Sequence, residues 1–529
     1  MNELVEYILE NKSKTLDLLD WSFRNNFIEM FNLDTILLMA KLRPDIEKIS
    51  IAYIYPEMLR NLQHLPNLKE LHLEECVVIQ EDWQEIVYLK KLESLSICRI
   101  EYIDKELFFY LSTLPNFLSL SIDECDYLSP KDLQNIYLIE DLNLLKLNNI
   151  RWSEYSFEIF ENIAKIKNLN ELIFLKKMSI TDEFLVALLP LKKNLKKLSI
   201  LFDEYDSDIC ISDQGIKTIS EFKLLCFLQI NNCQKITKSG YSFLINLPYL
   251  KTLKIKNCQV NDEILNLLNK LENLVELKIT GLHATTKPFS FISKLTNLQT
   301  LAFNFSISSL QGIGVLSKLQ ALELNGCKES NILNFNELLS LKHLKYVDFS
   351  YSLVDSNALS FLLNLPNLET LFLENCNNIT GEIHSSLIIQ SNFKNISFKS
   401  CINMNDKFLE SLSHILSLEK LNLSGCVKIS DEGIHYLTKL KNLTHLSLKN
   451  CIYLTYNTLK FLTLIPSLRT INLENCNNLS EEYLKQLLLL PNLKEINLRG
   501  CDKISDNFLI KNINLVEWHK YSYKHFLKK

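Results

Sequence analysis

Residues 418–442, LEKLNLSGCVKISDEGIHYLTKLKN, carry the pattern that decides the fold. In this stretch Leu418, Leu421, Leu423 and Cys426 form the string L-x-x-L-x-L-x-x-C. The apolar residues at offsets 3 and 5 alternate with polar ones, which is the period of a short strand with one buried face. The second half of the stretch places apolar residues at helical spacing. The expected unit is therefore one strand followed by one helix.

The same unit recurs along most of the chain. Further copies follow at a spacing of 25 residues, and earlier copies extend back to Ile46. We count 19 copies, whose first apolar residues are Ile46, Leu68, Leu92, Phe117, Leu142, Leu169, Leu195, Leu225, Leu250, Leu274, Leu298, Leu319, Leu344, Leu368, Phe393, Leu418, Leu443, Leu468 and Leu493. A frayed twentieth copy is read at Ile513, Val516 and Trp518.

A single copy cannot bury its apolar face, so the copies are expected to stack on one another. Stacking predicts an α/β solenoid over residues 46–511, with a parallel sheet on the concave face and helices on the convex face. This single elongated domain replaces the three or four domains that a length of 529 residues suggests.

Offset 8 of the unit is a cysteine in 11 of the 19 copies, namely Cys76, Cys125, Cys233, Cys258, Cys327, Cys376, Cys401, Cys426, Cys451, Cys476 and Cys501. The pattern L-x-x-L-x-L-x-x-C-x-x-[IL]-[ST]-[DE] resembles the cysteine-containing class of leucine-rich repeat. This class is best known from F-box/leucine-rich-repeat proteins, the substrate receptors of cullin-based ubiquitin ligases. The resemblance covers residues 46–511 and implies a leucine-rich-repeat horseshoe. It says little about function, because the same repeat serves many unrelated binding proteins.

Composition excludes several classes of function. Hydrophobic residues make up 47% of the chain and charged residues 22%, which is typical of a soluble globular protein. The net charge of −5 gives no reason to expect nucleic acid or an anionic membrane as a partner. Only 10 glycines occur, and no glycine-rich phosphate-binding string is present. Neither a secretory signal nor a membrane span is recognisable, so a cytoplasmic location is expected.

The cysteines are expected to be buried thiols that pack as small hydrophobic groups. No C-x-x-C pair and no zinc-like spacing of histidines accompanies them, so no metal and no cofactor is expected. Cys98 and Cys210 are out of register and are expected to react fast with thiol reagents. The acidic run at 203–208 is interpreted as a solvated loop rather than a cation site. No catalytic residues are identified, and the protein is not expected to be an enzyme.

The segments outside the repeats are interpreted as caps. Residues 1–45 are expected to form two or three helices, since apolar residues follow a helical period in two runs: Leu16, Leu19, Phe23 and Phe27, then Leu33, Ile36 and Leu37. These helices either cover the first repeat or form a divergent F-box that binds a ligase adaptor, although the usual Leu-Pro-acidic opening is missing. Residues 512–529 are assigned to a C-terminal cap and tail.

Side chains at offsets 2, 4 and 6 are expected to project from the concave face. Early repeats there are acidic, with Glu70, Glu74 and Asp123. Apolar and aromatic residues bordered by charge are typical of a protein-binding site. The candidate protein-binding residues are Ile173, Leu175, Leu201, Phe202, Phe227, Lys254, Lys256, Lys278, Phe305, Tyr346, Tyr351 and Phe372. Replacing Phe202, Tyr346 and Phe372 with Ala is expected to weaken binding and to leave the melting temperature nearly unchanged.

The sequence thus favours a non-enzymatic scaffold that captures a protein partner on the concave face. Two alternatives stay open for the whole chain. One is a substrate receptor of a ubiquitin ligase with an adaptor at its N-terminus. The other is a bacterial effector that mimics such a receptor in host cytosol. The high Asn, Lys and Ile content of the chain suggests an AT-rich genome, which is compatible with this alternative. A third possibility concerns Lys254, Lys256 and Lys278, which could hold an anionic small molecule as the resemblance to hormone-receptor members implies.

Overall fold

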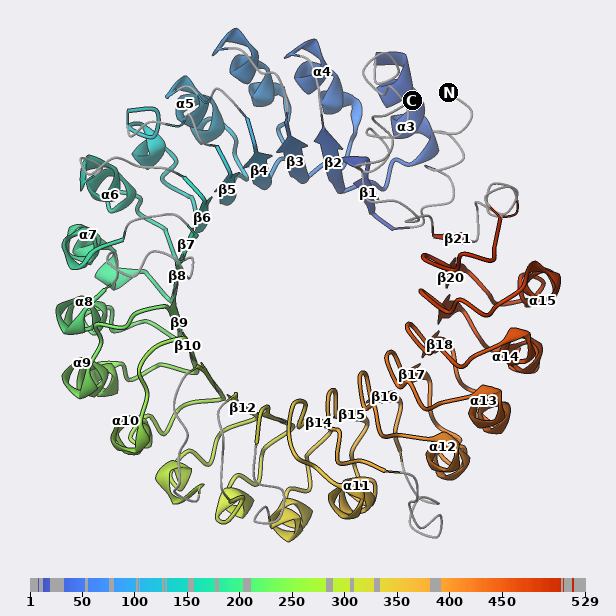
Figure 1. The fold of residues 1–529 in the computed structure, drawn as a ribbon. Coiled ribbons are helices and arrows are strands. Elements are labelled where there is room, and N and C mark those ends of the chain that lie inside the picture. Colours follow the sequence, from blue (N-terminus) through green and yellow to red (C-terminus); the bar gives the residue numbers. More distant parts are fainter. Residues whose placement is uncertain are drawn as a thin grey trace. The chain divides into compact units, whose positions relative to one another are not determined.

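A computed structural model describes most of the 529 residues. The described residues are 8, 13–19, 33–52, 56–75, 80–100, 103, 105–125, 128, 131–150, 157–176, 180–202, 211–281, 289–304, 309–327, 334–380, 392–505, 508 and 516–517. The chain divides into two compact units, Met1–Gln259 and Val260–Lys529. In each unit the strands lie on the inner side and the helices on the outer side (Figure 1).

All strand pairings within each unit are parallel and join neighbours in the sequence. The strands of the first unit are β1 (Thr15–Asp17), β2 (Lys48–Ala52), β3 (Glu70–Glu74), β4 (Ser94–Cys98), β5 (Ser119–Asp123), β6 (Leu144–Asn148), β7 (Glu171–Leu175), β8 (Lys197–Leu201), β9 (Phe227–Asn231) and β10 (Thr252–Lys256). Those of the second are β11 (Glu276–Thr280), β12 (Thr300–Phe303), β13 (Ala321–Leu324), β14 (Tyr346–Asp348), β15 (Thr370–Phe372), β16 (Asn395–Ser397), β17 (Lys420–Asn422), β18 (His445–Ser447), β19 (Thr470–Asn472), β20 (Glu495–Asn497) and β21 (Val516–Glu517).

Short helices cover the outer side. The α-helices of the first unit are α3 (Leu33–Leu42), α4 (Pro56–Asn61), α5 (Glu106–Ser112), α6 (Phe157–Ile163), α7 (Asp182–Ala187), α8 (Asp213–Ile219) and α9 (Lys238–Phe243). Those of the second are α10 (Asp262–Leu268), α11 (Ser356–Leu362), α12 (Asp406–Leu412), α13 (Asp431–Leu437), α14 (Tyr456–Leu462) and α15 (Glu481–Leu487). In three repeats a 3₁₀ helix follows the α-helix, at Leu62–His64 after α4, Leu189–Lys193 after α7 and Leu244–Asn246 after α9. Other described repeats use 3₁₀ helices, at Gln80–Tyr88, Ile136–Leu138, Phe289–Ile292, Ile313–Val315 and Phe335–Ser340.

The predicted solenoid is confirmed copy by copy. Strands β2 to β20 correspond one to one with the 19 predicted copies, and each begins two residues after the first apolar residue of its copy. In the copy that starts at Leu418, this residue, Leu421, Leu423 and Cys426 are at most 2% exposed. Ile434 and Leu437 of α13 are fully buried against them. The inward residues of strand and helix therefore form one continuous core within each unit.

In every copy whose offset-7 residue the structure describes, except the one that contains β8, the strand is followed by a residue in the left-handed conformation at offset 7. Asn450 and Asn475 have φ near 60°, and Glu75, Arg99 and Tyr351 adopt similar values. Asn and Gly tolerate this conformation best, whereas other residues pay a steric penalty of about 1 kcal/mol. The exposed Tyr351 therefore occupies a backbone position that favours much smaller residues.

The cysteine ladder is buried wherever the structure describes it. All ladder cysteines except Cys76, which lies outside the described residues, are at most 1% exposed. From Cys376 onward the thiols donate to backbone carbonyls of the preceding repeat, as in Cys401 Sγ to Leu373 O at 3.0 Å and Cys501 Sγ to Leu473 O at 3.1 Å. The earlier ladder cysteines donate to carbonyls of their own repeat, as in Cys233 Sγ to Asn231 O at 3.1 Å. The thiol thus fills a small apolar space and also satisfies a buried acceptor.

Burial also changes the expectation for Cys98. This thiol is half-buried at the end of β4, and burial raises its pKa to about 12, although the charge of Arg99 opposes the rise. Because the thiolate is the reactive form, the raised pKa disfavours the fast reaction expected of Cys98. The other residue of that prediction, Cys210, lies outside the described residues. Cys226, which the periodicity did not single out, is half-buried just before β9.

Alkylation of the native protein at pH 8, read by peptide mass spectrometry, checks this arrangement of thiols. Cys98 should react at least about tenfold more slowly than in the urea-unfolded chain, because few molecules carry its thiolate. The ladder cysteines should react only as repeats open. Uniform labelling of all cysteines in the native protein would contradict the buried ladder.

Carboxylates at helix N-termini tie neighbouring repeats together. Asp431, the first residue of α13, accepts hydrogen bonds from Thr455 N at 2.9 Å, Thr455 Oγ1 at 2.5 Å and Thr458 Oγ1 at 2.5 Å. Asp406 of α12 accepts from the backbone and hydroxyl of Ser430 in the same way. A Cβ on Gly433 would lie 2.3 Å from Asp406 Oδ1, so this glycine leaves room for the carboxylate.

Both ends of the chain add a strand to the sheet of their own unit. Thr15–Asp17 forms β1, which pairs with β2, so the expectation of helix at Leu16 is wrong. A lone strand gives no repeat signal, and its leucines mimicked a helical period. The helix expected around Ile36 is confirmed as α3, whereas Phe23 and Phe27 lie outside the described residues. At the other end Val516 lies in β21, which pairs with β20 as the frayed twentieth copy predicts.

Candidate functional site

Four predicted apolar residues of the first unit lie on the outward face of its sheet. Ile173 and Leu175 are on β7, Leu201 on β8 and Phe227 on β9, and all four are half-buried. Leu175 and Leu201 are register partners on neighbouring strands. Lys254 Nζ lies 5.4 Å from the centre of the Phe227 ring, so the ring is partly covered by a cation.

Phe202 does not join this surface. Its side chain is only 6% exposed, and its backbone N–H and C=O bond to the amide of the buried Asn231 at 2.5 and 2.9 Å. Phe202 occupies offset 7 of its copy, but it lacks the positive φ found at the other described offset-7 positions. Without the left-handed turn its side chain enters the core, so its prediction as a surface contact is wrong.

The predicted basic band is divided between the units. Lys254 and Lys256 lie on β10 of the first unit, and Lys278 lies on β11 of the second. Lys278 Nζ forms an ion pair with Glu323 at 2.9 Å. Its charge is therefore already balanced within its own unit, which weakens the case for an anionic ligand.

The early acidic residues are also neutralised. The guanidinium of Arg99 contacts Glu74, Glu75 and Glu124, the last at 3.1 Å. These carboxylates and that of Asp123, which Lys146 meets at 3.1 Å, do not form an open anionic wall.

The strongest candidate site lies on β13, β14 and β15 of the second unit. The rings of Tyr346 and Phe372 pack edge to face, with centres 5.5 Å apart and planes at 76°. Asp348 is the register partner of Phe372 on one side and of Glu323 on the other. We call Tyr346, Phe372, Asp348 and Glu323 the aromatic–acidic surface. All four side chains are half-buried on the face of the sheet that points away from the core.

Two ionisable groups of this surface have raised pKa values. Burial raises the pKa of Asp348 above its ordinary value, and Glu323 adds to the rise, while hydrogen bonds from Ser350 and Asn325 oppose it. The pKa of Tyr346 is also raised, first by burial and then by Asp348 and Glu323. Burial is the main cause of both shifts, and the neighbouring carboxylates add a smaller contribution.

Tyr351 lies beyond the end of β14 and is 63% exposed. Its backbone N–H donates to Glu374 O at 2.6 Å, which fixes the strained turn that carries it. Phe305, the last predicted aromatic residue, lies outside the described residues.

The acidic members of this surface, Asp348 and Glu323, were not predicted. Each is an ordinary polar residue at offset 4 of its own copy, so neither stands out alone. The signal that could have found them is two carboxylates at the same offset of consecutive copies, next to an aromatic residue at that offset in the third.

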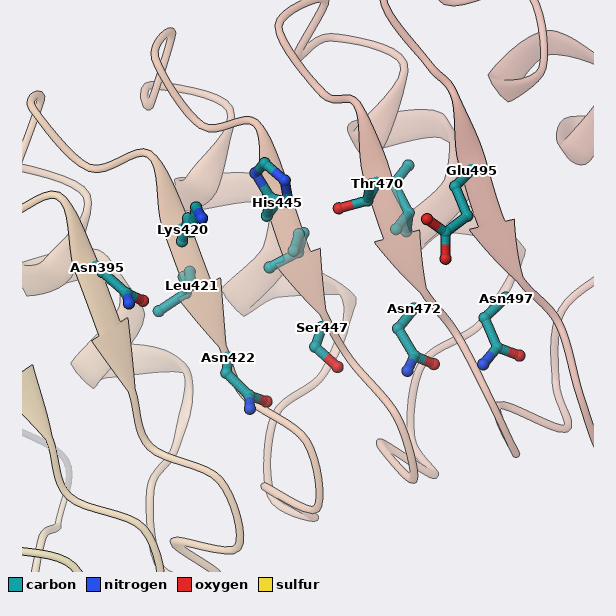
Figure 2. A pocket seen from close by; sticks show the side chains of 12 residues that line it. Asn395, Lys420, Leu421, Asn422, His445, Ser447, Thr470, Asn472, Glu495 and Asn497 are labelled. Carbon is teal, nitrogen blue, oxygen red and sulfur yellow. The ribbon is translucent and has the colours of Figure 1, made fainter. Parts of the chain in front are cut away.

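A second feature that sequence reasoning missed is a shallow polar groove of about 460 Å³ on β16 to β20. Figure 2 shows its amide, hydroxyl and imidazole side chains along neighbouring strands, including Asn422, His445 and Asn472. The Oδ1 atoms of Asn422 and Asn472 accept from backbone N–H groups two residues later, which fixes these amides. Burial and then Lys420 lower the pKa of His445, which favours its neutral form.

Two further observations concern the described residues alone. They contain no group of three or more His, Cys, Asp and Glu side chains placed to hold a metal ion. Their helices include none that is long and apolar enough to span a membrane.

Comparisons with known proteins agree with this geometry. A family model for the leucine-rich repeat region matches residues 207–462, just under half of the chain. A curated protein of Trypanosoma equiperdum, named "Putative adenylate cyclase regulatory protein", is 28% identical over 188 residues. The match covers 35% of this chain and 28% of that protein, so the chain spans less than a third of its relative.

Solved structures share the fold at low identity. The TLR13–ssRNA13 complex is similar over 91% of this chain and 72% of the solved chain, with a TM-score of 0.54 and 18% identity. The mouse RP105/MD-1 complex is similar over 91% and 94%, with a TM-score of 0.53 and 17% identity. The family model places a leucine-rich repeat region at residues 207–462, and the repeat geometry and the cysteine ladder continue the same fold through the copies on either side of it.

Proposed function

We propose that this protein is a scaffold that captures a protein partner on the outward face of the sheet in its second unit, and that it acts by binding rather than by catalysis. The observation that carries the proposal is the aromatic–acidic surface. Its two rings pack against each other and are only half-buried, on the face of the sheet that points away from the core. Large amphipathic rings bordered by charge are what protein interfaces use as anchors.

The rigidity of the sheet supports this role. Tyr346 and Phe372 stand on consecutive strands whose register is fixed on both sides, so little side-chain or backbone freedom is lost on binding. The exposed Tyr351 lies just beyond the C-terminal end of β14. The half-buried apolar residues of β7 and β8 offer a second and smaller contact region in the first unit.

The test is capture of partners from a eukaryotic lysate by the double variant Tyr346→Ala/Phe372→Ala. Capture of a specific partner should fall by about tenfold or more, since interface aromatic anchors contribute 2 kcal/mol or more. The matched control is Tyr456→Ala/Tyr483→Ala, which removes another packed aromatic pair, with centres 5.6 Å apart, from α14 and α15. Loss of capture in the helix variant with full capture in the strand variant would contradict the proposed face.

The ubiquitin-ligase alternative, whether in a cellular receptor or in an effector that mimics one, has no specific support in the described residues. The N-terminal segment contributes β1 to the sheet, where Leu16 is 1% exposed, as expected of a structural cap. Deletion of residues 1–45 would expose the edge of β2 and would therefore confuse loss of an adaptor with loss of stability. Substitution of the exposed Leu33 and Leu37 of α3 by Ser tests adaptor binding without removing β1.

A further inference from the structure

Asp348 lacks the charge compensation that its neighbours have. Glu323, the register partner of Asp348 on β13, pairs with Lys278 at 2.9 Å. Asp348 instead accepts hydrogen bonds from uncharged groups, the N–H of Ser350 at 2.9 Å and the amide of Asn325. No cation pairs with it among the residues that the structure describes.

This arrangement is costly for the fold. Two carboxylates at the same register position of neighbouring strands repel each other, and partial burial strengthens the repulsion. Neither carboxylate caps a helix as Asp431 does, although Asn325 of the preceding repeat donates to Asp348 and Lys278 pairs with Glu323. Such a departure from local stability is characteristic of a position that serves binding.

The neighbouring rings suit a cation. Phe372 is the direct register partner of Asp348, and Tyr346 precedes Asp348 by two residues on the same face. Tyr346 is flanked in register by the small side chains of Ala321 and Thr370, and its ring is only half-buried. The negative faces of aromatic rings attract ammonium and guanidinium groups, and the attraction grows when the cation is desolvated.

We propose that the aromatic–acidic surface binds an arginine side chain from a basic segment of the protein partner, with the guanidinium packed against Tyr346 and Phe372 and hydrogen-bonded to Asp348. Arginine is favoured over lysine because its planar group both stacks on rings and bonds a carboxylate with two N–H groups. This inference rests on the proposed function and specifies the chemistry of the partner.

The test uses the full chain and fluorescein-labelled peptides of alternating Gly and Arg, Gly and Lys, or Gly and Glu, followed by fluorescence anisotropy. The Arg peptide should bind more tightly than the Lys peptide, and the Glu peptide should not bind. Asp348→Asn should weaken binding of the Arg peptide by about tenfold or more, and Phe372→Ala should weaken it by a similar factor. The control Glu482→Gln removes the same charge from the outer helix α15 and should change affinity by less than about twofold.

Unfolding is separated from loss of binding by a thermal melt. Asp348→Asn relieves repulsion, so its melting temperature should equal or exceed that of the unmodified chain. Absence of Arg-peptide binding, equal weakening by Asp348→Asn and Glu482→Gln, or preference for the Glu peptide would each overturn the inference. If partner capture still depended on Tyr346 and Phe372 in that case, the proposed function would stand and only the basic chemistry of the partner would be wrong.

Discussion

Phe202→Ala should destabilise the first unit by about 3–5 kcal/mol, the usual cost of removing a buried phenylalanine ring. The ring is 6% exposed, and the backbone on which it stands is fixed by amide hydrogen bonds from Asn231 and Asn232 at 2.9 and 2.8 Å. Removal of the Phe202 ring would leave a cavity beside β8 and β9. The backbone at Phe202 cannot easily move to fill this cavity, because its hydrogen bonds hold it in place. Urea titration followed by tryptophan fluorescence and circular dichroism measures the loss.

The location of the loss is as informative as its size. In a solenoid each repeat contacts mainly its neighbours, so hydrogen exchange should accelerate in β8 and β9 before it does in distant strands. The matched control is Phe227→Ala on the outward face of β9, which should cost less than about 1.5 kcal/mol because its ring is half-buried. Equal losses in the two variants would mean that Phe202 is a surface residue, as its position in the repeat first suggested.

The repeat could be predicted from the sequence because every copy confirms the others. Leucines at offsets 0, 3 and 5 recur often enough that the start of each strand from β2 to β20 was placed correctly. The same method failed where a copy stands alone or departs from the pattern. β1 has no aligned partner in the sequence, and Phe202 sits in the longest copy, where the offset-7 turn is not made.

The candidate site could be predicted only in part, for a different reason. Tyr346 and Phe372 were recognisable because aromatic residues at outward offsets are unusual. Asp348 and Glu323 were not, because a single acidic residue at such an offset is common in any soluble repeat. Their significance depends on register across strands, on burial and on which carboxylate Lys278 reaches, and none of these can be read from one copy at a time.

Asp431→Ala should lower the free energy of opening the last repeats by about 2–4 kcal/mol. The carboxylate accepts three hydrogen bonds from the next repeat, two of them from Thr455 and one from the hydroxyl of Thr458, which is fully buried. A bond to a charged acceptor contributes about 1.5–3 kcal/mol, and bonds that share one carboxylate do not add in full. Loss of Asp431 also removes a negative charge from the N-terminal turn of α13.

The cysteine ladder provides the local measurement for this variant. Cys426 and Cys451 are fully buried in the two repeats that Asp431 joins, so pulse alkylation of these thiols reports how often the repeats open. When opening and closing are fast relative to alkylation, a loss of 2–4 kcal/mol should raise their labelling rates by about 30-fold or more, whereas Cys125 in the other unit should be unchanged. The control Glu432→Ala removes an exposed carboxylate from the same helical turn and should raise labelling by less than about threefold. Comparable rates in the two variants would show that helix electrostatics, and not the hydrogen bonds to Thr455 and Thr458, hold these repeats together.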